Sequence, residues 1–229
     1  MANSKKIFIS MGTPYTPDYA KYRDELEDFL RDQCQLDPRI IDKNEFPTGN
    51  PLTKIRDVMK SCNGLIAIAY ERTHVADGAG KRGSSQQFEI KDKDYTTVWN
   101  HIEIAMAYSM NLPIYVLCQE GLVTDGLIEN KDYWRIQFAK IVPGEMQSYA
   151  FGEGIRLWAK DKVMKSKSGE DYLKSLAGNK KISEYTPREI ISTFTLLLGF
   201  FGGGYAFREF LSPQFLPFVH AVMKYLKIG

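Results

Sequence analysis

Short apolar runs recur along the first half of the chain. The runs at 6–11, 64–70 and 112–118 consist mostly of apolar residues, which is typical of strands in a parallel sheet that is covered on both faces. A weaker run at 39–41 has the same β-branched character. We therefore predict four strands in this half of the chain.

Amphipathic segments lie between these runs. Over 18–34, 52–59 and 98–110, apolar side chains recur at steps of three and four residues, the period of a helix with one buried stripe. Pro17 stands where the first turn of the first helix is expected. Strands and helices that alternate in this way favour right-handed crossovers and a parallel α/β sheet with helices on both faces.

The stretch 71–97 is rich in charged residues, Gly and Ser and lacks apolar periodicity. Because it is long for an ordinary connection, we expect a functional or mobile loop. Within it, Gly78–Ser85 echoes a phosphate-binding loop without fitting the G-x-x-x-x-G-K-[ST] pattern. Two interpretations stay open for this segment: a solvated loop, or a lid over a bound diphosphate. Farther along, one peripheral strand is expected, at 135–142 or at 154–158.

The carboxyl-terminal part of the chain differs in character. The predicted α/β domain covers 1–160, and the polar, lysine-rich stretch 161–185 is typical of a linker. From 190 to 207, eighteen residues carry no formal charge, which is near the lower limit for crossing a bilayer and equally suits a buried helix in a subunit interface. Both interpretations stay open for the hydrophobic helical region 186–229.

Charge and cysteine usage indicate which partners and which cellular compartment to expect. Thirty Lys and Arg residues against twenty-eight Asp and Glu residues leave a net charge of +2, too small to predict a nucleic-acid partner. The three cysteines lie far apart, and the first residues lack the apolar stretch of a secretory signal. We expect a reduced, cytoplasmic protein, for which membrane association through 190–207 stays an open alternative. The three histidines show no metal-ligand spacing, so no metal site is predicted.

The helix predicted at 98–110 contains one unusual acid. Glu103 stands among apolar residues on nearly every side of that helix, one turn after Trp99. Burying an ionised carboxylate costs several kcal/mol unless it is paired or faces a pocket, and Asn100 is near enough on the helix to share such a pocket. Two interpretations are open: Glu103 faces a cavity, or it pairs with a basic side chain at the helix surface.

The predicted topology also indicates where a ligand binds. In an open parallel sheet, the loops that follow the carboxyl ends of the strands form the binding crevice. Here those loops are 10–16, 42–50 and 71–97, and each is rich in polar groups. A binding site is therefore expected at this edge of the sheet.

Several segments resemble the Toll/interleukin-1 receptor (TIR) domain family. They are Lys-Ile-Phe-Ile-Ser at 6–10, the segment 55–69, Trp99-Asn-His-Ile-Glu103 and Pro113-Ile-Tyr-Val-Leu. TIR domains typically show a similar first strand, a Trp-x-x-x-Glu signature on a helix and a Pro-Ile strand just after it. The resemblance spans 5–120 of this chain.

The same region is similar to the nucleoside 2-deoxyribosyltransferase-like group. In that group a Glu-x-Ala helix followed by a Pro-containing strand carries the catalytic carboxylate, and Glu103 and Ala105 match that motif. Both families have a flavodoxin-like architecture. The resemblance therefore implies a flavodoxin-like α/β fold with a carboxylate that works at an N-glycosidic bond.

The resemblance implies roles for particular residues. Cleavage of a C1′–N bond builds positive charge on the ribose, which a nearby carboxylate stabilises or captures, so Glu103 is the expected catalytic residue. Trp99 and either Tyr70 or Phe46 are the expected apolar walls. The remaining residues of the expected substrate site are Ser10, Gly12, Thr13, Thr16 and Asn100.

Three functions follow from the resemblance. The first is an NAD glycohydrolase, with NAD as substrate and no cofactor, in a self-associating bacterial immune effector. The second is a nucleoside deoxyribosyltransferase-like enzyme. The third is a catalytically inactive TIR-type module that signals through contacts between copies of itself.

Overall fold

The computed structural model describes residues 4–46, 49–129 and 134–177. These residues belong to one compact unit, Met1–Ala177, and a second unit covers Gly178–Gly229. The predictions for 186–229, including the uncharged segment 190–207, lie outside the described residues. None of the helices in the described ranges has the length and apolar character that a membrane span needs.

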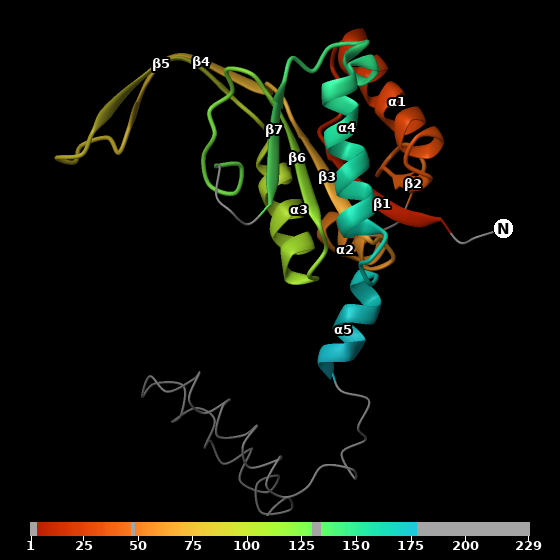
Figure 1. Cartoon of the computed structure of the whole chain (residues 1–229). Helices are drawn as coiled ribbons and strands as arrows, with labels where there is room; N and C mark the ends of the chain where they lie inside the picture. The colour runs from red at the N-terminus through yellow and green to blue at the C-terminus, as the bar shows by residue number, and fades with distance from the viewer. Residues whose placement is uncertain (1–3, 47–48, 130–133, 178–229) are drawn as a thin grey trace, which may run out of the picture. The chain divides into compact units, whose positions relative to one another are not determined.

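A five-stranded parallel sheet forms the centre of the first unit (Figure 1), which confirms the predicted α/β class. The strand order is β2-β1-β3-β6-β7, a flavodoxin-like arrangement in which the chain reverses its direction of travel at β1 and β3. Their bounds are β1 Lys5–Met11, β2 Leu36–Arg39, β3 Gly64–Ala69, β6 Ile114–Gln119 and β7 Arg135–Ala139.

Helices cover both faces of the sheet (Figure 1). Helices α1 (Pro17–Asp32) and α4 (Tyr149–Trp158) pack on the face that carries Ile9, Ile66 and Ile68. Helices α2 (Pro51–Lys60) and α3 (Val98–Ser109) pack on the face that carries Phe8 and Ala67. Successive side chains of a strand point to opposite faces, so Ser10 lies on the α3 face with Phe8.

Side-chain caps fix where the helices start. The side chains of Thr16, Asn50 and Thr97 accept hydrogen bonds from backbone N–H groups in the first turns of α1, α2 and α3. These caps satisfy amides that have no partner within the helix. The cap at Thr97 sets the start of the helix that carries Glu103.

The stretch 71–97 is not a structureless loop, and that prediction was wrong. It forms an antiparallel hairpin of β4 (Thr73–Gly80) and β5 (Phe88–Tyr95), which projects from the domain in Figure 1. Most of its side chains are exposed, and pairs such as Asp77 with Lys91 face each other across the ladder. Because no face of the hairpin is buried in the core, its strands lack the apolar alternation that sequence patterns detect.

The weak strand predicted at 39–41 begins earlier in the structure. It is β2, which pairs with β1 from Leu36 onward, and Pro38 lies within it. Proline is tolerated here because β2 is an edge strand with one unpaired side. The peripheral strand is β7, so the alternative at 154–158 was wrong, since those residues belong to α4.

The chain beyond α4 continues in contact with the sheet. A π-helical turn spans Ala159–Val163, and α5 spans Gly169–Ala177. Val163 is fully buried, and the backbone N–H of Gly169 donates to the Cys62 carbonyl at 3.1 Å. Residues 159–169 therefore pack against the same domain at the amino-terminal side of the strands.

Candidate active site

Glu103 lies in the second turn of α3, directed toward the carboxyl end of β1. Its side chain is 8% exposed, and Ser10 and Asn100 beside it are completely buried. All three lie close to the point where the strand order reverses, between β1 and β3, which is the place where open α/β sheets bind ligands. The structure thus brings together three of the nine site residues expected from the sequence.

A directional chain of hydrogen bonds joins these residues. Thr96 Oγ1 donates to Asn100 Oδ1 at 2.9 Å, and Asn100 Nδ2 donates to Ser10 Oγ at 2.9 Å and to the Ser10 carbonyl at 3.2 Å. Because its hydroxyl oxygen already accepts from Asn100, Ser10 is free to donate its proton to the Glu103 carboxylate. These hydrogen bonds orient the Ser10 hydroxyl toward the Glu103 carboxylate.

The environment keeps Glu103 close to the balance between its two protonation states. Burial raises the pKa of this carboxyl group from 4.5 to about 7, and the hydrogen bond from Ser10 offsets part of the rise. Desolvation penalises the ionised form, whereas a donor stabilises it. Near neutral pH the group is therefore available both as a carboxylate and as an acid.

Glu103 does not form an ion pair at the helix surface. It is buried, and within the ranges that the structure describes no Lys or Arg side chain pairs with it. That alternative interpretation was wrong, because α3 presents this side of the helix to β1 rather than to solvent.

Tyr70 lies on the other face of the sheet from Glu103. Side chains along β3 point to alternate faces, and Tyr70, which directly follows this strand, lies on the same face as Ile66 and Ile68. Its ring lies 4.4 Å from that of Tyr19 in α1, measured between centroids. Its hydroxyl donates to the carbonyls of Gly12 at 2.7 Å and Thr13 at 3.2 Å. Tyr70 thus supports the loop after β1 instead of standing beside the carboxylate.

The other polar residues of that loop have local roles. The side chain of Thr16 caps α1 by accepting from the backbone N–H of Tyr19 at 3.2 Å. The side chain of Thr13 is exposed, and its carbonyl accepts from Arg72 Nη1 at 2.5 Å. A side chain at Gly12 would meet Arg72 and the Tyr70 hydroxyl at 3.4 Å, so the backbone at this position runs close to both groups.

The two remaining aromatic candidates are largely exposed. Trp99 opens α3 and is 43% exposed, while Phe46 follows β2 and is 70% exposed. Among the described residues, no side-chain hydrogen bond joins either of them to Glu103. The role of Trp99 and Phe46 as apolar walls of a substrate site stays a prediction.

Several residues near this edge were not anticipated from the sequence. Thr96 begins the hydrogen-bond chain, and Arg72 lies over the rings of Tyr15 and Tyr70 at 5.3 and 5.9 Å. Gln119, at the end of β6, accepts from the backbone N–H of Glu71 at 2.9 Å. The density of tyrosines around 15–22 was the available signal for the aromatic cluster, whereas Thr96 became visible only once the strand order was known.

The histidines and acidic residues of the described ranges were candidates for metal ligands. Among the described residues, no cluster of three or more His, Cys, Asp and Glu side chains is arranged to hold a metal ion. His101 lies 3.7 Å from Asp125, and His74 lies 2.7 Å from Asp94, each measured between a ring nitrogen and a carboxylate oxygen. Both histidines therefore interact with acids away from Glu103.

Comparisons with known proteins give only distant similarity. No protein-family model and no curated protein matches the sequence. The structure is similar to that of BcmB, a CMP N-glycosidase of Clostridium botulinum, with 19% identity over 59% of this chain and 87% of that chain and a TM-score of 0.34. A conserved protein from Enterococcus faecalis V583 matches with 12% identity over 69% of this chain and 98% of that chain, with a TM-score of 0.39. Similarity this low carries no conclusion about activity, and the resemblance to TIR domains stays a prediction.

Proposed function

We propose that this protein cleaves the N-glycosidic bond of a nucleotide or nucleoside, with NAD as the first substrate to test and Glu103 as the carboxylate that faces C1′. The observation that supports the proposal is the placement of Glu103. It is a buried acid with a hydroxyl donor and no cationic partner among the described residues, at the edge of the sheet where α/β folds bind ligands.

The proposed chemistry uses the negative charge of Glu103. As the C1′–N bond of NAD breaks, the bonding electron pair leaves with nicotinamide, which becomes neutral, and positive charge develops on the ribose. The ionised carboxylate stabilises that charge or bonds to C1′. Water then adds its oxygen to C1′ and releases one proton, giving ADP-ribose.

Ser10 and Asn100 act as positioning residues in this proposal. Asn100 fixes the orientation of the Ser10 hydroxyl at 2.9 Å, and that hydroxyl steadies the carboxylate. A carboxylate held in place before the reaction needs little reorganisation when charge develops on the sugar. The loop at 12–13, tied to Tyr70 and Arg72, is the adjacent backbone against which a nucleotide would lie.

The pH dependence of the rate distinguishes two substrate classes. Nicotinamide leaves from a cation and needs no proton, so its release requires ionised Glu103 and should increase as pH rises through about 7. A neutral nucleobase leaves better when protonated. If the protonated acid supplies that proton, the rate should fall over the same interval.

The test is a substrate panel analysed by mass spectrometry. Purified full-length protein is incubated with NAD, ribonucleotides, ribonucleosides and deoxynucleosides, over a range of protein concentrations that covers self-association. We expect nicotinamide and ADP-ribose, or a cyclised form of it, from NAD, and none from a Glu103→Gln variant that retains the wild-type circular dichroism spectrum.

Other outcomes assign other functions. Consumption of deoxynucleosides with NAD left intact would favour the deoxyribosyltransferase-like alternative. No product from any substrate at any concentration would contradict the enzymatic proposal and favour an inactive module that works through contacts between copies.

A further inference from the structure

A concave region lies at the opposite edge of the sheet from Glu103. It is a groove of about 990 Å³ whose lining includes Pro113 and Ile114 at the start of β6 and Arg135 at the start of β7. Because the strands are parallel, these residues mark the amino-terminal edge, whereas Ser10 and Tyr70 mark the carboxyl-terminal edge. The groove therefore shares no lining residue with the candidate active site.

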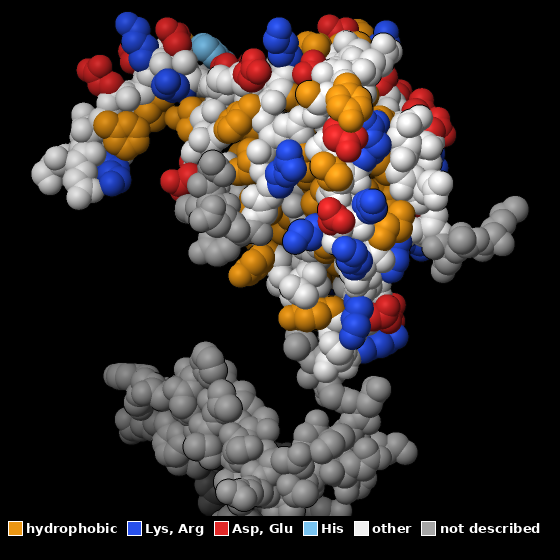
Figure 2. Space-filling model, viewed as in Figure 1, with side chains coloured by type: hydrophobic (Ala, Val, Ile, Leu, Met, Phe, Trp, Pro, Cys, Tyr) orange, Lys and Arg blue, Asp and Glu red, His pale blue; other side chains and the backbone are white. Residues whose placement is uncertain are grey.

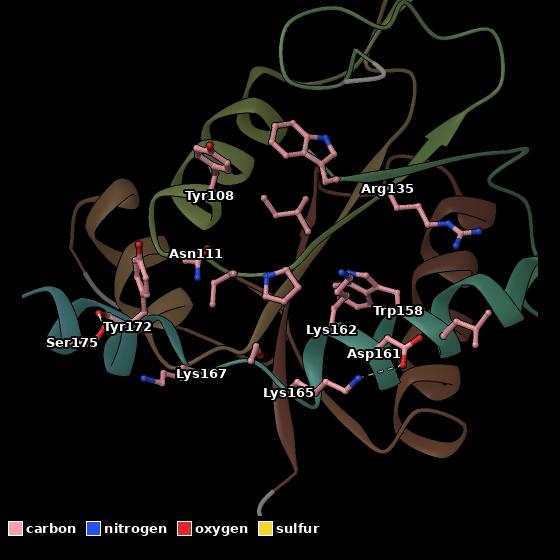
Figure 3. Close-up of a pocket in the computed structure, with 16 residues that line it drawn as sticks. Tyr108, Asn111, Arg135, Trp158, Asp161, Lys162, Lys165, Lys167, Tyr172 and Ser175 are labelled. Atoms are coloured by element: carbon pink, nitrogen blue, oxygen red, sulfur yellow. Dashed lines mark hydrogen bonds and ion pairs between the residues drawn. The ribbon is translucent and has the colours of Figure 1, made fainter. Parts of the chain in front are cut away.

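Aromatic side chains form much of the wall of the groove. Tyr108 comes from α3, Trp134 directly precedes β7, Trp158 ends α4, and Tyr172 comes from α5. In Figure 3, Tyr108 and Asn111 stand across the opening from Lys165 and Lys167, with Tyr172 and Ser175 at one end and Arg135 and Trp158 toward the other. Aromatic rings on several sides of a groove suit a flat aromatic group, since bases stack on such rings without regard to sequence.

The charges that line the groove are predominantly positive. Arg135, Lys162, Lys165 and Lys167 contribute four positive charges and Asp161 one negative charge, a balance of +3 among the lining residues. Lys165 is 3.7 Å from Asp161, measured between Nζ and a carboxylate oxygen. No ion pair involves Lys162 or Lys167 within the part of the chain that the structure describes. Figure 2 shows Lys and Arg side chains gathered over α4 and the residues just after it.

We propose that this groove is a second ligand site that binds a nucleotide, with the base between the aromatic side chains and the phosphates on the lysines. The groove is of the size of small-molecule sites. Its excess of positive charge complements a phosphate chain, and its aromatic walls complement a base. A ligand with only one of these features would leave the other half of the groove unused.

The groove favours a small ligand over a membrane surface. An anionic bilayer is flat, and proteins meet it with basic residues beside protruding apolar side chains. Here the aromatic side chains line a concavity, and Trp158 is buried. A bilayer would reach the rims of such a groove and leave its interior empty.

Binding is measured by tryptophan fluorescence in a Trp99→Phe background. The chain has three tryptophans, so this variant leaves only Trp134 and Trp158, both of which line the groove. ATP, adenosine and inorganic triphosphate are titrated separately into the full-length protein. We expect ATP to quench the fluorescence, and adenosine and triphosphate to bind at least about tenfold more weakly, because each engages only part of the groove.

Variants then locate the binding. The double variant Lys162→Glu/Lys167→Glu should weaken ATP binding about tenfold or more, since two attractive contacts with phosphate become repulsive. The matched control Lys91→Glu/Lys140→Glu makes the same change in net charge at exposed positions that do not line the groove, and it should leave binding unchanged. Tyr172→Ala should weaken ATP about fivefold or more and triphosphate little, because it removes a stacking surface.

Several results would overturn the proposal. They are no quenching by millimolar ATP, an equal loss of affinity in both double variants, or tighter binding to single-stranded oligonucleotides or phosphatidylserine vesicles than to ATP. Glu103→Gln separates the two proposals. Loss of ATP quenching in that variant would place the ligand at the candidate active site, whereas unchanged quenching supports a second site even if no N-glycosidase activity is found.

Discussion

Two glutamates of this domain are equally buried and differ in almost every other respect. Glu27 of α1 is 6% exposed and Glu103 of α3 is 8% exposed. Glu27 is held by Lys43 and by Arg31, the latter one turn along the same helix at 3.3 Å. Glu103 has a hydroxyl donor, Ser10, and no cationic partner among the described residues. Burial alone therefore does not mark a carboxylate as functional, whereas its partners separate the two cases.

The two environments have different physical consequences. Cations beside a buried carboxylate compensate for its lost hydration, and the group then serves to join elements, here α1 to the segment after β2. A buried carboxylate without such compensation has a raised pKa. It can therefore still bind a proton or stabilise positive charge on a ligand. On this basis Glu27 is a structural acid, whereas the partners of Glu103 are compatible with the catalytic role that we propose for it.

The strongest test of this comparison exchanges each acid for its amide. Glu103→Gln should lower N-glycosidase activity by at least about a thousandfold, because the neutral amide does not stabilise charge on the ribose. Glu27→Gln should leave kcat/KM within about threefold of wild type at a temperature where both proteins are folded. Comparable losses in the two variants would mean that the activity reports folding and not the chemistry of one carboxylate.

The pH dependence of stability provides a second test that needs no substrate. The pKa of Glu103 is raised from 4.5 to about 7 on folding, so its favourable contribution is complete below pH 4.5 and is lost as pH rises through 7. The loss corresponds to ~3 kcal/mol if the whole shift is expressed. Relative to wild type, Glu103→Gln should therefore be more stable at pH 8 than at pH 4 by up to that amount. Urea unfolding at a series of pH values measures the difference, and a constant difference between pH 4 and pH 8 would contradict the assignment.

Glu27→Gln should lower stability instead. The change leaves Lys43 and Arg31 without the carboxylate that joins them, although Lys43 keeps Asp24 at 2.6 Å and Arg31 is half exposed. We expect a loss of about 1–3 kcal/mol in the free energy of unfolding at pH 7, below the full cost of breaking a buried pair. Asp57→Asn, which removes an exposed partner of Lys60, is the matched control and should leave the free energy of unfolding almost unchanged, because solvent screens exposed ion pairs. Equal losses in the two variants would show that Glu27 is not a structural anchor.

The contrast between core and periphery explains what the sequence predicts. The central strands were anticipated because they are buried on both faces and form apolar runs. Helices α1, α2 and α3 were anticipated because each buries one stripe, which leaves a period of about 3.6 residues. The β4–β5 hairpin was missed because cross-strand pairs such as Asp77 with Lys91 are polar and exposed. Its stability comes from a backbone ladder, which leaves little trace in the pattern of side chains.

The same reasoning applies to the candidate site. Apolar neighbours on α3 marked Glu103 as unusual but left two interpretations open, a cavity and an ion pair at the helix surface. Its contact with Ser10 and the position of Tyr70 on the far face both depend on strand order. Right-handed crossovers from β1 to β2 and from β3 to β6 run in opposite directions, so α1 and α3 cover opposite faces. Tyr70 faces α1 for that reason. The residue types in the loops that follow β1 and β3 do not indicate on which face Tyr70 lies.

The smallest predicted effect concerns Ser10, whose hydroxyl donates a hydrogen bond to Glu103. In Ser10→Ala the carboxylate loses the hydroxyl that stabilises its charged form, so the pKa of Glu103 should rise further. A hydrogen bond to a charged group is worth about 1.5–3 kcal/mol, which corresponds to about one to two pH units. The midpoint of the pH dependence of stability, and that of the rate of nicotinamide release, should both move to higher pH. Ser61→Ala removes a hydroxyl that donates to the Val58 carbonyl at 2.8 Å on α2, remote from the acid, and should leave both midpoints unchanged. If Ser10→Ala lowers stability by the same amount at every pH, Ser10 contributes only to packing and not to the ionisation of Glu103.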